Sequence, residues 1–284
     1  MLYGGLVIRR LLLLAVAGLL AAVLLRFAPG FEADERDLMA TSSEESRVVR
    51  QQERAEERNV FGYYGQRLAG LVRGDWGHSR LYNRPVAELL GERGASTAQL
   101  VAVGWTAGWV TGLSAALTGL LFTSRWGEGI ASFLAGAVLT IPAAILAILV
   151  LYLGGSVMIA LVLVVGSRVY FYCRNLLDQA RTQAHVLAAR ARGTTRARLL
   201  VWHVLAPLIP ELAALGAATF TMALGASVPI EAVCDLPGLG QLTWKAAQAR
   251  DLAVLVSVTW IMTAASLTVN TLADLVSPSG RSAA

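Results

Sequence analysis

Six apolar blocks organise the chain, and polar connectors of very different length separate them. The blocks lie at residues 11–28, 95–123, 130–153, 156–172, 208–230 and 252–276. About 20 apolar residues are enough to cross the hydrocarbon core of a bilayer as a helix. The pattern therefore predicts an all-α integral membrane protein with six transmembrane helices.

Two of the connectors constrain how neighbouring blocks run. Residues 124–129 and residues 154–155 are so short that they can join only antiparallel neighbours. Pro142 falls inside the third block, and a proline within a helix removes a backbone N–H and bends the helix. We expect a kink at this position.

Composition supports the membrane assignment. The 284 residues are 56% hydrophobic and 15% charged, with a mean hydropathy of +0.58, which lies outside the ordinary soluble range. The net charge of +5 and the pI near 9.6 are explained by arginines gathered at membrane edges. We therefore expect membrane lipid as a partner and no nucleic acid.

Residues 29–94 are the one sizeable polar segment, and they are rich in acidic residues and arginine. Residues 43–58 within it are typical of a solvated helix. Further along, Gly74 and Gly77 bracket Asp75 and Trp76, a pattern typical of a tight turn that seats an aromatic ring at the membrane interface. The segment is predicted to be a small outer region that follows the first helix.

Arginines in short loops indicate the orientation, because such loops carry more positive charge on the cytoplasmic side. Arg9, Arg10, Arg125 and Arg281 all fall on the same side of a six-helix topology, together with an arginine-rich stretch at residues 178–210. This arrangement predicts that both termini lie in the cytoplasm.

The stretch at residues 178–210 has the character of a docking surface. It contains Arg181, Arg190, Arg192, Arg196 and Arg198 beside a single acid, Asp178. Its middle is a run of alanines, which lets another backbone approach closely, and Gly193 follows that run. A glycine after a helical run is the usual place for a helix to end.

The ionisable residues of the apolar blocks exclude several kinds of activity. Arg168 is expected near the inner end of the fourth helix, and the central parts of the second to sixth blocks carry essentially no ionisable groups, which argues against a proton relay. A phosphate-binding loop needs Gly-Lys before Ser or Thr, and the only lysine is Lys245, in Trp-Lys-Ala. The chain is therefore not expected to hydrolyse ATP, and its three histidines lack metal-ligand spacing.

Three alternatives stay open from the residues alone. Ser114 lies in an apolar block and would be the nucleophile of a membrane-embedded serine hydrolase, although small residues there are more often helix-packing positions. A structural membrane subunit without a transport path is a further reading. The loop at residues 231–251 is either a plain tight connection or a short re-entrant element that closes the outer mouth of a path.

Several separated motifs match one family. They are RFAPG at 26–30, RGDWGHS at 73–79, RPVAELL at 84–90, ARARG at 189–193, DLPGLGQL at 235–242 and ARD at 249–251. With these motifs in this order, the sequence resembles the inner-membrane permease subunit of binding-protein-dependent ABC importers, in the dipeptide, oligopeptide and nickel branch. The chain departs from that family at Leu187, where an acidic residue is common, and in a run from Gly193 to Pro210 that looks about one residue short and contains Pro207.

The resemblance implies a division into 1–28 (first helix), 29–94 (extracytoplasmic segment) and 95–284 (permease core), with a coupling helix region at 178–205 and an outer loop at 231–251. It implies as partners a second homologous permease subunit, two ABC ATPase subunits and an extracytoplasmic solute-binding protein. ATP and Mg would be used by the ATPases, with no catalytic, metal or cofactor site in this chain. The cargo would be peptides, nickel complexes or another small solute.

The resemblance also implies two groups of site residues. Those that would couple to the ATPase are Ala188, Ala189, Arg190, Ala191, Arg192, Gly193 and Thr194. Those that would form an outer gate or touch the binding protein are Asp235, Pro237, Gly238, Leu239, Gly240, Gly74, Asp75, Trp76 and Gly77.

Overall fold

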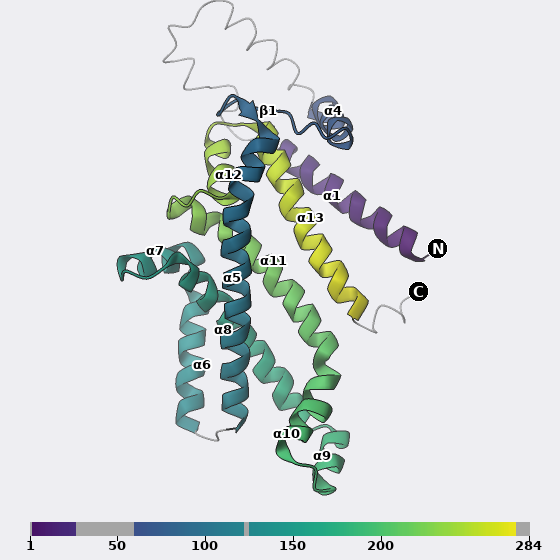
Figure 1. The fold of residues 1–284 in the computed structure, drawn as a ribbon, viewed down its shortest axis with the longest axis vertical. Helices are drawn as coiled ribbons and strands as arrows, with labels where there is room; N and C mark the ends of the chain where they lie inside the picture. Colours follow the sequence, from purple (N-terminus) through teal and green to yellow (C-terminus); the bar gives the residue numbers. More distant parts are fainter. Residues whose placement is uncertain (1, 27–59, 122–124, 277–284) are drawn as a thin grey trace, which may run out of the picture. The chain divides into compact units, whose positions relative to one another are not determined.

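The computed structural model describes residues 2–26, 60–121 and 125–276, and helices dominate these residues (Figure 1). The expected solvated helix at 43–58 lies outside them. The elements before the middle of the chain are α1 (Leu2–Arg26), α4 (Val60–Val72), β1 (His78–Ser79), β2 (Arg84–Pro85), α5 (Val86–Leu121), α6 (Arg125–Thr140) and α7 (Ala143–Tyr152). Those after it are α8 (Val157–Arg181), α9 (Ala184–Ala191), α10 (Arg196–Arg198), the π-helix η1 (Leu199–Leu205), the 3₁₀-helix η2 (Ala206–Leu208), α11 (Ile209–Val233), α12 (Leu239–Gln248) and α13 (Leu252–Val276).

Within the described residues, four helical passes are long and apolar enough to cross a membrane. They are Val86–Gly119, Val157–Arg181, Arg196–Val233 and Leu252–Val276, and the bent pair α6 and α7 makes a fifth if it is counted as one span. The apolar part of α1, Leu12–Leu24, is shorter. An all-α membrane protein is thus confirmed, and the total of six spans stays a prediction.

The third apolar block is not a single straight span. Helix α6 ends at Thr140, α7 begins at Ala143, and the two axes differ by 108°. Pro142 lies at the break and caps α7, and its carbonyl accepts a bond from the N–H of Leu146 at 3.0 Å. Proline cannot donate within a helix and disfavours helical geometry in the residue before it, so the expected kink is a full break.

The fourth helix is longer than its apolar block. The block ends at Tyr172, whereas α8 continues to Arg181, so Arg168 lies near the middle of the helix instead of close to its end. Residues that follow Tyr172, such as Arg174, Leu176 and Gln179, are good helix formers in water as well as in lipid. The change in polarity after Tyr172 therefore does not mark the helix end.

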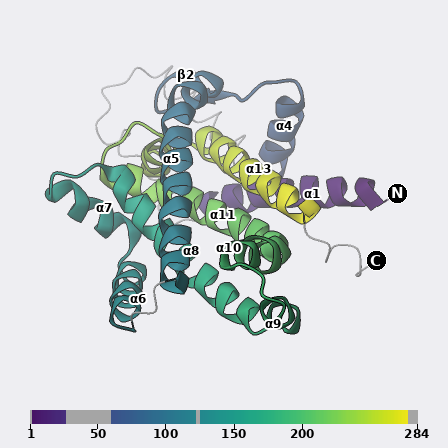
Figure 2. The ribbon, with the colours of Figure 1, turned by 60° about the horizontal axis from the view of Figure 1, so that its bottom comes forward.

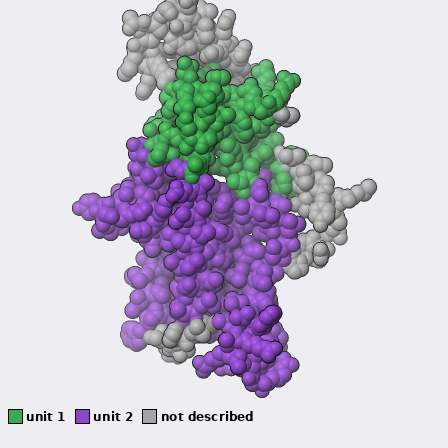
Figure 3. Space-filling model, in the orientation of Figure 1, with its two compact units in different colours: residues 1–95, 237–265 green, residues 96–236, 266–284 purple. Residues whose placement is uncertain are grey.

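Close contacts divide the chain into two compact units, coloured separately in Figure 3. Unit 1 contains Met1–Ala95 and Pro237–Ala265, and unit 2 contains Ser96–Leu236 and Ser266–Ala284. These two units are defined by packing contacts, whereas the segments predicted from the sequence are defined by function. The predicted division into 1–28, 29–94 and 95–284 therefore stays a prediction.

The core of unit 2 depends on a close crossing of α5 and α8 (Figure 2). A Cβ added to Gly112 of α5 would lie 2.4 Å from the carbonyl oxygen of Gly166 on α8, and one added to Gly108 would lie 2.7 Å from Val165. Small residues at such a crossing allow backbones to pack directly. Gly112 therefore fits the packing role expected for this region.

Two tryptophans tie α5 to α11 within the same unit. The indole N–H groups of Trp105 and Trp109 donate to the hydroxyl of Thr219, at 3.1 and 2.9 Å, and that hydroxyl donates to the carbonyl of Leu215 at 2.8 Å. Thr219 is buried. One hydroxyl thus satisfies two bulky donors that would otherwise be costly in an apolar interior.

Unit 1 is built around α12, the first turns of α5 and the first half of α13. Val86, Leu89, Leu242 and Val254 are all buried in one apolar cluster. A second cluster surrounds Trp260, whose indole N–H donates to the hydroxyl of Tyr64 at 3.2 Å, and burial raises the pKa of this hydroxyl.

Candidate functional site

The predicted coupling residues lie on α9 and on the turn that ends it. Val186 and Ala189 are buried, whereas Ala188, Arg190 and Ala191 are exposed, so one face of this short helix is fixed and the other is open. In Figure 1, α9 lies near α10, at the end of unit 2 that is drawn lowest.

Gly193 ends the helix as the sequence predicts. Its φ of +75° is a left-handed conformation that suits glycine, and its N–H donates to the carbonyl of Arg190 at 3.0 Å. The N–H of Thr194 reaches the carbonyl of Ala189 at 3.3 Å. A Cβ at Gly193 would meet no atom within 4 Å, so the position is open on the outside.

Helix α9 is held against the start of a long helical pass. The Nε2 atom of His185 lies 3.0 Å from the carbonyl oxygen of His203, which belongs to the π-helix η1. From there the chain runs through η2 into α11 as one helical pass, Arg196–Val233. A π-helix of seven residues is rare and often marks a functional site. The unusual run with Pro207 thus coincides with irregular helix geometry.

The exposed face of α9, α10 and η1 is basic and partly apolar. Arg190, Arg192, Arg196 and Arg198 are exposed, and within the described ranges none of them forms an ion pair. Leu187 is 52% exposed and Trp202 is 68% exposed. Free guanidinium groups beside exposed apolar side chains are suited to a protein surface that is acidic and apolar in the same places.

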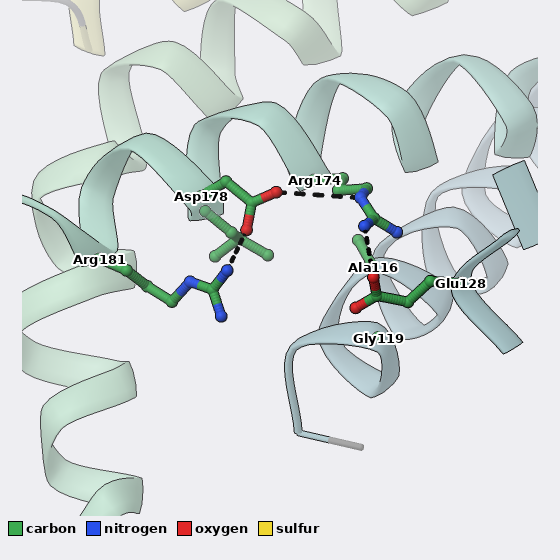
Figure 4. A pocket seen from close by; sticks show the side chains of 7 residues that line it. Ala116, Gly119, Glu128, Arg174, Asp178 and Arg181 are labelled. Carbon is green, nitrogen blue, oxygen red and sulfur yellow. Dashed lines mark hydrogen bonds and ion pairs between the residues drawn. The ribbon is translucent and has the colours of Figure 1, made fainter. Parts of the chain in front are cut away.

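An ionic cluster joins α6 to α8 in the same unit (Figure 4). Arg174 donates to Glu128 at 2.8 Å, lies 3.9 Å from Asp178, and also donates to the hydroxyl of Tyr170 at 3.0 Å. Arg181 pairs with Asp178 from the other side. No local sequence pattern predicts the bond between Glu128 and Arg174, because the two residues are far apart in the chain.

The predicted turn at 74–77 is confirmed as a turn. Gly74 and Gly77 have φ values of +80° and +72°, and the N–H of Gly77 donates to the side chain of Asp75 at 2.7 Å. Trp76 packs against the apolar clusters of unit 1, which include Leu239. Within unit 1, the structure thus brings Trp76 together with the start of α12.

The other predicted outer residues surround the end of α11 and the start of α12. Asp235 has a φ of +50°, and the N–H of Leu236 donates to the carbonyl of Glu231 at 3.0 Å. Gly238 precedes α12, and Leu239 and Gly240 are buried in its first turn. The loop therefore contains a packed helix and is more than a tight connection, although its role as a gate stays a prediction.

Asp251 is a buried residue that the sequence did not single out as a site. It is 1% exposed, and its carboxylate accepts bonds from the hydroxyl of Ser79 at 2.6 Å and from the N–H groups of Leu81 and Val254 at 3.1 and 3.3 Å. Nearby, Arg93 donates to Gln241 at 3.1 Å. Asp251 thus fastens the small hairpin of β1 and β2 to the start of α13.

Replacing Asp251 with alanine should lower the free energy of unfolding by about 2–3 kcal/mol, because buried donors lose a charged acceptor. Ser79→Ala should cost about 1–2 kcal/mol, since the hydroxyl loses its bond to Asp251 and the bond that it accepts from the N–H of Tyr82. Thermal unfolding of the detergent-solubilised protein measures both changes, and the exposed Gln248→Ala serves as control. Equal midpoints for Asp251→Ala and Gln248→Ala would contradict the proposed role.

Arg84 lies beside this hairpin on the exposed surface. It donates to Glu92 at 2.6 Å and to Glu88 at 3.1 Å, and these two hydrogen bonds raise the pKa of the Arg84 guanidinium. Exposed ion pairs contribute little to stability. The three side chains instead set the local charge pattern where α5 begins.

Ser114 lies on an exposed side of α5. In the part of the chain that the structure describes, none of the histidines forms a bond with it. Gly112, two residues before it, is the position that packs on α8. The described residues therefore contain no pair of Ser114 and a histidine that could act as the catalytic dyad of a serine hydrolase.

Known proteins with similar sequences are transport permeases. A protein of Brucella ovis with a peptide permease name is 28% identical over an alignment of 237 positions, which covers 73% of this chain and 74% of the relative. The glutathione transport system permease protein GsiC of Escherichia coli (strain K12) is 23% identical over an alignment of 293 positions, which covers 95% of each chain.

Residues 108–278, more than half of the chain, match the family described as binding-protein-dependent transport system inner membrane component. Members of this family are permease components of ABC importers, which work with ATPase and binding-protein partners, and the partner ATPase subunits hydrolyse the ATP. The chain therefore belongs to the family of binding-protein-dependent transport system inner membrane components and is a multi-pass permease and not an enzyme.

Proposed function

We propose that this permease forms half of a translocation path for peptides or a similar small solute. A second homologous permease subunit would supply the other half, two ATPase subunits would bind on the cytoplasmic side, and an extracytoplasmic binding protein would deliver the solute. One observation carries this proposal: α9 is exposed and basic on one face and is joined on the other to the helical pass that ends in α11.

Coupling would begin at the exposed face of α9. Closure of an ATPase dimer around ATP would move α9, and the contact between His185 and His203 would pass that movement to η1 and on to α11. Helix α8 would move as well, since only Thr182 and Gln183 separate it from α9. The transporter would then alternate between two conformations, and ATP bound to the ATPase subunits would favour one of them.

The opposite ends of these helices would meet the binding protein. With both termini in the cytoplasm, the turn at Gly74–Gly77 and the loop that includes Asp235 and the residues from Pro237 to Gly240 would face outward. Trp76 and the start of α12 share one apolar cluster, which would let a contact at either turn shift the other.

The cargo assignment rests on the relatives. One carries a peptide permease name and another a glutathione transport name, so a peptide-like solute with free carboxylates fits both. A nickel complex would be the alternative within the same branch of the family. This chain would bind no cofactor itself, and ATP and Mg would be used by the ATPase partners.

Gly238→Val is expected to reduce the stimulation of ATPase activity by loaded binding protein at least fivefold. Gly238 is buried directly before α12, and its carbonyl accepts the N–H of Leu242 at 3.0 Å, so a branched side chain would displace the first turn of α12. Gly65→Val is the control, because a Cβ there meets no atom within 4 Å. Equal stimulation in both variants would show that the loop has no part in the response to the binding protein.

Reconstitution tests the proposed function directly. The permease would be placed in proteoliposomes with the second permease subunit, the ATPases and the binding protein encoded by genes beside its own. Uptake of a labelled peptide would then be measured with and without ATP. We expect uptake that requires ATP, the binding protein and both permeases. Peptide hydrolysis by the permease alone, lost in Ser114→Ala, would instead support a serine hydrolase.

A further inference from the structure

A polar stripe runs along the second half of α8. Arg168, Tyr172, Asn175 and Gln179 are all exposed, and Tyr172 exposes 54% of its side chain. Their spacing of four, three and four residues places them on one face of the helix. Among the residues that the structure describes, the side chains of these four form no hydrogen bond or ion pair; the backbone carbonyl of Gln179 accepts a bond from the hydroxyl of Thr182 at 2.8 Å.

The stripe faces away from the core of unit 2. Val169, Cys173 and Leu177 occupy the opposite side of the same turns and are buried in the main apolar cluster. Nearer the beginning of α8, Leu161 and Val165 pack on the glycines of α5. The polar face thus becomes exposed where the close crossing with α5 ends.

Arg168 lies near the middle of α8, a helix long and apolar enough to cross a membrane. It is eleven residues into α8, or about 16 Å along the helix axis from Val157. The ion pair between Arg174 and Glu128 lies six residues further, about 9 Å along the axis. Since a hydrocarbon core is about 30 Å thick, an arginine here either lines a polar space or is strongly disfavoured.

The side chain of Arg168 is not oriented to reach the ionic cluster around Arg174 and Asp178. Helical side chains lean toward the N-terminus of their helix, so Arg168 leans toward Val157 and away from Arg174 and Asp178. These two charged residues also face α6 through Glu128, on another side of α8.

We propose that this α8 stripe lines the solute path and that the guanidinium of Arg168 binds a carboxylate of the passing solute. An arginine presents two parallel N–H donors that match a carboxylate. Tyr172, Asn175 and Gln179 would supply neutral hydrogen bonds to amide groups, which would hold a peptide without trapping it. The inference rests on the proposed function and narrows its cargo to solutes that carry a carboxylate.

The test uses the complete importer in proteoliposomes and two probes, trialanine and its C-terminal amide. Arg168→Gln should reduce ATP-driven uptake of trialanine at least tenfold and uptake of the amide less than twofold. Because the same binding protein delivers both probes, the ratio of the two losses isolates the contribution of the permease. Arg168→Lys, which keeps the charge, should retain at least a third of trialanine uptake, whereas Arg168→Leu should behave like Arg168→Gln.

The control is Arg9→Gln, which removes an exposed arginine from α1 and should leave both uptakes unchanged. Wild-type uptake by Arg168→Leu would place Arg168 against lipid and overturn the proposal. Equal loss for both probes, or loss of the second permease on purification of Arg168→Gln, would assign the residue to the subunit interface and overturn it too. Wild-type importer that takes up neither probe would instead contradict the proposed peptide transport itself.

Discussion

Gly193→Trp is expected to abolish ATP-driven uptake, by at least 50-fold, while the protein still inserts and folds. A Cβ at Gly193 meets no atom within 4 Å, so the chain itself has room for a large side chain. The left-handed φ of +75° adds a strain of about 1–2 kcal/mol. The large loss would come from the ATPase, because the indole would occupy the space in which the partner contacts the end of α9.

Gly154→Trp is the matched control for the strain. Gly154 also follows a helix, has a φ of +78°, and has nothing within 4 Å of a Cβ, but it lies after α7. It should retain at least half of wild-type uptake in the same proteoliposome assay. If Gly154→Trp and Gly193→Trp lose uptake equally, backbone strain and not ATPase contact explains the result.

Gly112→Leu is expected to prevent the helices of unit 2 from packing. Its Cβ would lie 2.4 Å from the carbonyl oxygen of Gly166, and a backbone atom cannot move aside as a flexible side chain can. Overpacking of this kind costs about 3 kcal/mol or more. Very little protein should elute as a monodisperse species from size-exclusion chromatography in mild detergent.

Gly119→Leu provides the comparison on the same helix, since a Cβ at Gly119 meets no atom within 4 Å. This variant should elute like wild type at a similar yield. Wild-type behaviour of Gly112→Leu would show that α5 and α8 do not cross as closely as the structure indicates.

Local sequence patterns correctly predicted the structural features that depend only on neighbouring residues. The last apolar block, 252–276, coincides with α13, because its length and its uniformly apolar character leave few other conformations. Gly193 ends α9 and the glycines around Trp76 form a turn, since both depend on backbone conformations that glycine favours. The family could also be recognised from short motifs alone.

Features that depend on contacts between distant segments were not predictable in the same way. The carboxylate of Asp251 is satisfied by Ser79 and Leu81, which lie far away in the sequence. The end of α8 was expected too early because the change in polarity was taken as a helix boundary. The same error placed Arg168 near the end of the helix, whereas it lies near the middle. The break at Pro142 was expected as a kink, and its angle depends on packing that no local pattern describes.

Photo-crosslinking from α9 tests the central claim, that this helix is the contact with the ATPase. A photoreactive amino acid would replace the exposed Leu187 or, as control, the exposed Leu153 beyond the end of α7. In membranes that contain the full importer, irradiation should join the Leu187 variant to an ATPase subunit and leave the Leu153 variant without such an adduct. No ATPase adduct from Leu187, or equal adducts from both positions, would contradict the assignment of α9 as the coupling helix.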